Sequence, residues 1–150
     1  MTGTKISMEE AHLAGIDVNF ERMKNGEKRF RLVSTDGSSY CRTIASERGG
    51  WQNSHYHKVV SEFYVVQSGW IVYAEISSKG ALNVSFLHEG ECVAVKPFVH
   101  HNIFLPPHAV IHTIKYGNGS PDIDWFPSKE LDQHTHKLLE DDLFKMGKED

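Results

Sequence analysis

The stretch from Gly49 to Gly69 reads GGWQNSHYHKVVSEFYVVQSG, and it places two histidines and one glutamate close together in the chain. His55 and His57 are two residues apart, so on a strand their side chains point to the same face. Glu62 follows, and the intervening Lys58–Ser61 is long enough for the chain to turn. Neutral imidazole nitrogen with one carboxylate oxygen suits Zn, Fe, Mn, Ni or Co. The stretch therefore predicts three converging metal ligands.

The spacing G-x5-H-x-H-x4-E-x6-G resembles the first signature of the cupin superfamily, position for position. The second signature of that family reads G-x5-P-x-G-x2-H-x3-N, and a partial match to it begins at Gly90. His101 stands where the family has its last histidine ligand. Lys96 replaces the proline, Phe98 the glycine and Leu105 the final asparagine. The turn before His101 must therefore be built differently from that of the family.

This resemblance covers about residues 40 to 117. It implies an all-β fold, the cupin double-stranded β-helix or jelly-roll barrel, to which the residue pattern described below adds short N-terminal and C-terminal helices. It also implies a site for one divalent transition metal per chain, which the ligands do not identify among Fe, Mn, Zn and Ni. Its ligands are His55, His57, Glu62 and His101. His100 is the alternative fourth ligand if the register of its strand slips by one residue.

Alternating hydrophobicity and turn signals predict short strands at intervals of about ten residues, which is typical of a sandwich or barrel. Only the cupin resemblance selects the jelly roll among these folds. All 150 residues are expected to form one domain, with a barrel core over about 16–117 and a C-terminal helical segment over about 128–146. Ser7–Glu10 is a capping box for a short N-terminal helix.

Ser128 is expected to cap one C-terminal helix with an apolar face. That face is expected to pack on the barrel or on a second subunit. It consists of Leu131, Leu138, Leu139, Leu143 and Phe144.

Two residues outside the ligand set are candidate catalytic groups. Tyr64 shares a strand face with Glu62, so it could donate a proton or a hydrogen bond to a molecule on the metal, or it could only pack. His112 could face the barrel interior as a general base, or it could be a hydrogen-bonded core histidine. His108 follows two prolines and is expected in a loop, and Trp125 is interpreted as a packing residue.

Composition excludes several classes of protein. The net charge is -4 and there is no run of Lys and Arg, which argues against a nucleic-acid partner. No apolar run is long enough for a membrane span. The N-terminus lacks a basic region followed by an apolar core, so we expect a cytoplasmic protein. Cys41 and Cys92 are expected to be buried free thiols.

The resemblance implies a mononuclear metalloenzyme that acts on a small polar molecule, such as a sugar derivative or a small organic acid. Isomerase, epimerase or lyase chemistry and iron-dependent dioxygenase chemistry both stay open, because a ligand set of this kind leaves positions free on the metal. The alternative is a cupin that binds a metal or a small ligand without catalysis. The family's habit and the apolar C-terminal face suggest a homodimer.

Overall fold

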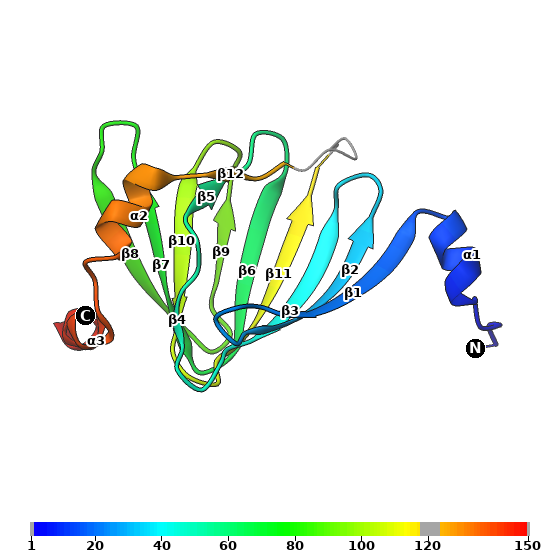
Figure 1. Cartoon of the computed structure of the whole chain (residues 1–150), viewed down its shortest axis with the longest axis horizontal. Coiled ribbons are helices and arrows are strands. Elements are labelled where there is room, and N and C mark those ends of the chain that lie inside the picture. The colour runs from blue at the N-terminus through cyan, green and yellow to red at the C-terminus, as the bar shows by residue number, and fades with distance from the viewer. Residues whose placement is uncertain (1, 118–123, 150) are drawn as a thin grey trace.

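The computed structural model describes residues 2–117 and 124–149, and its strands form two antiparallel sheets (Figure 1). The first sheet has the order β1 (Ile16–Arg22), β2 (Lys28–Ser34), β3 (Ser39–Ile44), β11 (Val110–Tyr116), β6 (Ser61–Ser68) and β9 (Cys92–Val95). The second has the order β12 (Phe126–Pro127), β5 (His55–Tyr56), β10 (His100–Leu105), β7 (Trp70–Ile76) and β8 (Leu82–His88), and β4 (Gly50–Trp51) also pairs with β10.

The main hydrophobic core lies between the two sheets. Tyr64 and Ile111 reach it from the first sheet, and Ile71, Ile103 and Leu105 reach it from the second. All five are almost completely buried. Because side chains alternate along a strand, each of these strands gives one face to the core. This confirms the predicted all-β fold with short terminal helices.

The N-terminal helix α1 (Met8–Leu13) begins where the capping box predicts. The Ser7 hydroxyl accepts a hydrogen bond from the backbone N–H of Glu10 at 3.1 Å. Figure 1 shows this helix and the C-terminal helices at opposite ends of the long axis of the molecule. Among the described residues, no helix is long and apolar enough to span a membrane.

The C-terminal segment forms two helices, α2 (Lys129–Thr135) and α3 (Glu140–Glu149), where the sequence predicts one. Ser128 caps the start of α2, and the chain turns after the end of this helix. The break allows Leu131 and Leu143, both fully buried, to contact two different hydrophobic clusters of the second sheet. Part of the apolar face therefore packs on the barrel, whereas Leu139 and Phe144 stay exposed.

Strand β2 does not follow the usual rule that apolar side chains face the interior. Phe30 and Leu32 lie on the outer surface of the first sheet and are 37% and 45% exposed. Arg29 and Arg31 alternate with them and line a cavity on the inner side of this sheet. Charged side chains therefore line part of the cavity next to the core.

Phe98 takes the backbone conformation that the cupin signature assigns to glycine. Its φ angle is 68°, in the left-handed region that glycine favours. Its N–H donates a hydrogen bond to the carbonyl of His57 at 2.6 Å. The turn before β10 is therefore built with Phe98 in a backbone conformation that glycine favours, and it is tied directly to His57.

One expectation about the thiols is wrong. Cys41 is buried on β3, but Cys92 is exposed. Cys92 lies at the start of β9, which is an edge strand of the first sheet, so one side of this strand has no neighbour in the sheet. An apolar sequence around Cys92 did not distinguish this edge strand from a central one.

Candidate metal centre

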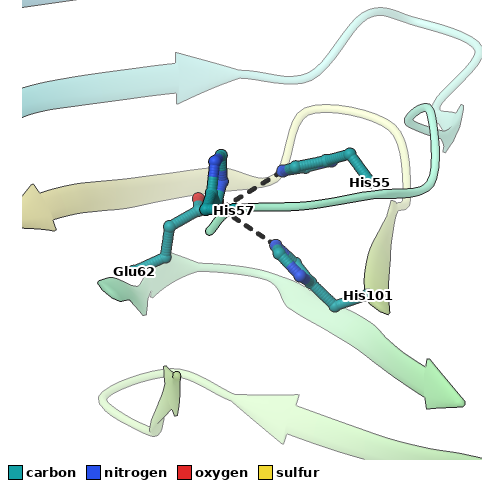
Figure 2. A group of neighbouring side chains, drawn as sticks. All are labelled: His55, His57, Glu62 and His101. Carbon is teal, nitrogen blue, oxygen red and sulfur yellow. Dashed lines mark hydrogen bonds and ion pairs between the residues drawn. The ribbon is translucent and has the colours of Figure 1, made fainter. Parts of the chain in front are cut away.

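The four predicted ligands converge on one buried point between the sheets (Figure 2). His55 lies on β5 and His101 on the neighbouring β10, where the two residues are direct partners across the ladder. His57 follows β5, and Glu62 comes from β6 in the other sheet. One donor atom of each lies within 4.8 Å of the other three. The geometry that the spacing predicts is present, although a bound metal stays a prediction.

The strand register selects His101 over its neighbour His100. His101 is fully buried in the cluster, whereas the His100 ring stacks on Tyr56, with 4.2 Å between the ring centroids. The Nδ1 atom of His100 also lies 2.7 Å from the hydroxyl oxygen of Ser128. The slip of one residue considered from the sequence therefore does not occur.

Backbone carbonyls fix the protonation of all three rings. The Nδ1 atoms of His55 and His101 lie 2.9 Å from the carbonyl oxygens of Asn53 and Val99. The Nδ1 atom of His57 contacts the carbonyl oxygen of Asp124. A carbonyl only accepts, so each Nδ1 carries a proton, and each ring in its neutral form presents its lone pair at Nε2.

Those three lone pairs face the carboxylate of Glu62. Its Oε1 lies 3.2 Å from Nε2 of His55 and 2.9 Å from Nε2 of His101, and it also contacts Nε2 of His57. Four acceptors that meet in a buried place repel one another unless a cation lies among them. This arrangement fits a divalent transition metal, which binds neutral imidazole and carboxylate together.

The electrostatics of the cluster agree with ligation. Burial lowers the pKa of His55, which favours the neutral ring that can bind a metal. His55 is therefore neutral, as a histidine ligand of a metal must be.

Asp124 positions His57 and the turn that follows it. Its carboxylate accepts backbone hydrogen bonds from Lys58, Val59 and Val60 at 2.8 to 2.9 Å, while its own carbonyl contacts the His57 ring. These hydrogen bonds lower the pKa of Asp124, although its burial acts in the opposite direction. The charged carboxylate thus holds the turn between His57 and Glu62.

We predict that Asp124→Ala weakens metal binding by about 10- to 100-fold, the usual cost of losing a group that orients a metal ligand. Three backbone N–H groups lose their acceptor, so the turn and the position 124 carbonyl that contacts the His57 ring are no longer held in place. Competition between the protein and a chromophoric zinc chelator measures the affinity. Asp17→Ala, at an exposed position in β1, is the control and should bind zinc like the wild type. Equal affinity of the two variants would show that Asp124 does not orient His57.

A cavity of about 140 Å³ adjoins the cluster and is lined by His55, Glu62 and Tyr64. Tyr64 is 2% exposed, and its ring centroid lies 6.0 Å from that of His101. Burial and the nearby Glu62 carboxylate raise the pKa of its hydroxyl well above 10.0. Tyr64 therefore lies on the Glu62 face of β6, as the sequence predicts, with a protonated hydroxyl.

His112 lies elsewhere, which corrects the expectation that its ring could face the interior. Ile111 points into the core, so the next residue of β11 points outward. The His112 ring accepts a hydrogen bond from the Tyr40 hydroxyl at 2.6 Å and donates one to the Gln67 side chain at 2.7 Å. His108 lies in a turn outside the cluster, with a φ angle of 64°.

Sequence reasoning missed the aromatic and cationic residues of the cavity wall. Trp125 was interpreted as packing, but it lines the cavity, and its ring stacks on His55 with centroids 5.5 Å apart. Arg29, Arg31 and Lys115 also line the cavity. The spacing of the two arginines on one strand face was the available signal, but nothing in the sequence showed which face is inside.

Comparison with known proteins supports the fold. Neither the family models nor the curated proteins contain a match. Oxalate decarboxylase from Bacillus subtilis matches with a TM-score of 0.61 and 15% identity, over 85% of this chain and 36% of that chain. The Drosophila melanogaster CENP-C cupin domain matches with a TM-score of 0.54 and 14% identity, over 67% of this chain and 76% of that chain.

The capsular polysaccharide assembling protein CapF from Staphylococcus aureus has a TM-score of 0.58 and 17% identity, over 73% of this chain and 32% of that chain. This chain thus spans only about a third of the oxalate decarboxylase and CapF chains. Identities this low establish a shared fold and nothing further. The chain therefore has the cupin fold, with a buried cluster of three histidines and one glutamate that could bind one metal ion.

Proposed function

We propose that the protein is a mononuclear metalloenzyme that acts on a small polar molecule. The observation that carries this proposal is the convergence of three unprotonated Nε2 atoms on the Glu62 carboxylate beside a cavity. His55, His57, Glu62 and His101 would hold the metal. A metal at such a site supplies Lewis-acid chemistry or, if it is iron, redox chemistry.

The chain's own residues would bind and orient the molecule in the cavity. Tyr64 places its side chain on the wall two residues after Glu62, and we assign to its hydroxyl a hydrogen bond to the bound molecule. The ring of Trp125 closes the His55 side of the cavity and limits the access of water to the cluster. Gln52 lines the same wall and adds a polar group.

A cupin that binds a metal or small ligand without catalysis is the second candidate. The structural similarity is compatible with both candidates, because the similar structures include oxalate decarboxylase as well as the CENP-C cupin domain. Isomerase or lyase chemistry and dioxygenase chemistry differ in whether oxygen is consumed. We also propose that the protein is a homodimer and is cytoplasmic, as the sequence leads us to expect.

The test is to load the metal-free protein separately with Fe(II), Mn(II), Zn(II) and Ni(II). Each form is then incubated with panels of small acids and sugars, with and without oxygen. We expect turnover with one metal and none in the His101→Ala variant. Oxygen consumption with iron would identify a dioxygenase, and turnover without oxygen an isomerase or lyase. Bound metal without turnover of any compound would favour the binding module instead.

A further inference from the structure

Three cationic side chains line the cavity beside the cluster, and all come from the inner face of the first sheet. Arg29 and Arg31 belong to β2, and Lys115 belongs to β11. The strand register places Lys115 directly opposite Glu62, where Cα atoms of paired residues are about 5 Å apart. The register thus brings a lysine next to the candidate metal ligands.

The same register brings Arg31 into the row of the sheet that ends at Tyr64. Arg31 pairs with Cys41, Cys41 pairs with Thr113, and Thr113 pairs with Tyr64. All four side chains of this row line the cavity. Arg31 therefore faces the same cavity as Tyr64 from the same face of the first sheet, three strands along the order β2-β3-β11-β6.

The three cations differ in how far they are neutralised. Arg29 donates two hydrogen bonds to Glu27 at 2.9 and 3.1 Å, and Glu27 is only 3% exposed. Arg31 contacts Glu21 at 2.6 Å, but the Glu21 side chain is 44% exposed, so water weakens this pair. Within 2–117 and 124–149, Lys115 forms no ion pair with a carboxylate.

The cavity wall therefore has excess positive charge. Glu62 is its only acidic residue among the described positions, and a metal at the cluster would add two further positive charges. Neutral hydroxyl and amide side chains complete the polar wall. Such a cavity attracts an anion, and a guanidinium or an ammonium matches a carboxylate through charge-assisted hydrogen bonds.

The size of the cavity limits the anion. Its volume of about 140 Å³ is close to that of an engineered cavity of about 150 Å³ that accepts benzene. We propose that this cavity binds a small organic carboxylate of about six non-hydrogen atoms, with its carboxylate held by Arg31 and Lys115. This inference rests on the proposed function and names the substrate class of that site.

Lactate and lactamide test the proposal, because they have the same number of non-hydrogen atoms and differ in charge. Each is titrated into zinc-loaded protein by calorimetry, and the zinc content is measured separately. We expect lactate to bind at least about tenfold more tightly than lactamide, since hydrogen bonds to charged groups are the stronger ones. Lys115→Gln and Arg31→Gln should each weaken lactate binding about tenfold, with lactamide binding and zinc content unchanged.

Arg42→Gln is the matched control, because Arg42 lies on the adjacent strand β3 but is exposed on the outer side of the sheet. It should bind lactate like the wild type. If zinc is held but lactate has no advantage over lactamide, or neither binds, the anion site is wrong and the metal site stands. If wild-type protein holds no zinc, the proposed function fails, and titration of the metal-free protein then tests the cationic cavity by itself.

Discussion

His57→Ala is expected to lower the affinity for zinc by more than about a hundredfold. Removing a group that only orients a metal ligand lowers the metal affinity about 10- to 100-fold. Removing a ligand itself should lower the affinity further. The His57 ring is 2% exposed and is fixed at Nδ1 by the Asp124 carbonyl, so its lone pair is already aimed at the cluster. No other described histidine can replace it without rebuilding the turn.

Competition with a chromophoric chelator measures this affinity in the wild type and the variant. His88→Ala is the control, because His88 is exposed at the end of β8 and lies in none of the described metal-ligand clusters. It should bind zinc as tightly as the wild type. A His57→Ala protein that retains wild-type affinity would mean that the cluster does not hold a metal through this ring.

Gly49→Ala is expected to reduce the free energy of unfolding by about 3 kcal/mol or more. Gly49 has a φ angle of 67°, which costs a residue with a Cβ about 1 to 2 kcal/mol. A Cβ there would also lie 2.5 Å from the carbonyl oxygen of Leu105 and 2.9 Å from backbone atoms of Pro106 and Pro107. Backbone atoms cannot move aside as a flexible side chain would.

Gly90→Ala is the matched control for this substitution. Gly90 is the first glycine of the second signature and has a φ angle of 81°, but no atom lies within 4 Å of the place where its Cβ would be. Only the backbone cost of about 1 to 2 kcal/mol applies there. Urea unfolding measures both. If the two variants lose equal stability, the close approach of Gly49 to the backbone of Leu105–Pro107 is not what requires glycine at position 49.

The sequence predicted the fold and the cluster because the spacing of the signature residues reflects the geometry of the strands. The two-residue spacing of His55 and His57 and the turn before Glu62 predicted the convergence. The position of His101 was predicted by resemblance even though Phe98 replaces a glycine, because Phe98 adopts the same backbone conformation at some cost in strain.

The cavity wall could not be predicted in the same way. On β11, Val110, His112 and Ile114 alternate with Ile111, Thr113 and Lys115, so both faces mix apolar and polar side chains. A register irregularity between β11 and β6 at Val110 and Ile111 also makes it harder to tell from the sequence which face of β11 is inside. The usual rule would turn Phe30 and Leu32 inward, but the structure turns the arginines inward. Polar residues that face a cavity break the rule that sequence reasoning depends on.

Metal content tests the central claim of a buried metal centre most directly. The protein, purified without a His tag and without added metal, is compared by elemental analysis with the His55→Ala/His57→Ala double variant. We predict about one transition metal ion per chain in the wild type and almost none in the double variant. A wild-type protein without metal, even after reconstitution, or a double variant with equal metal content would contradict the account.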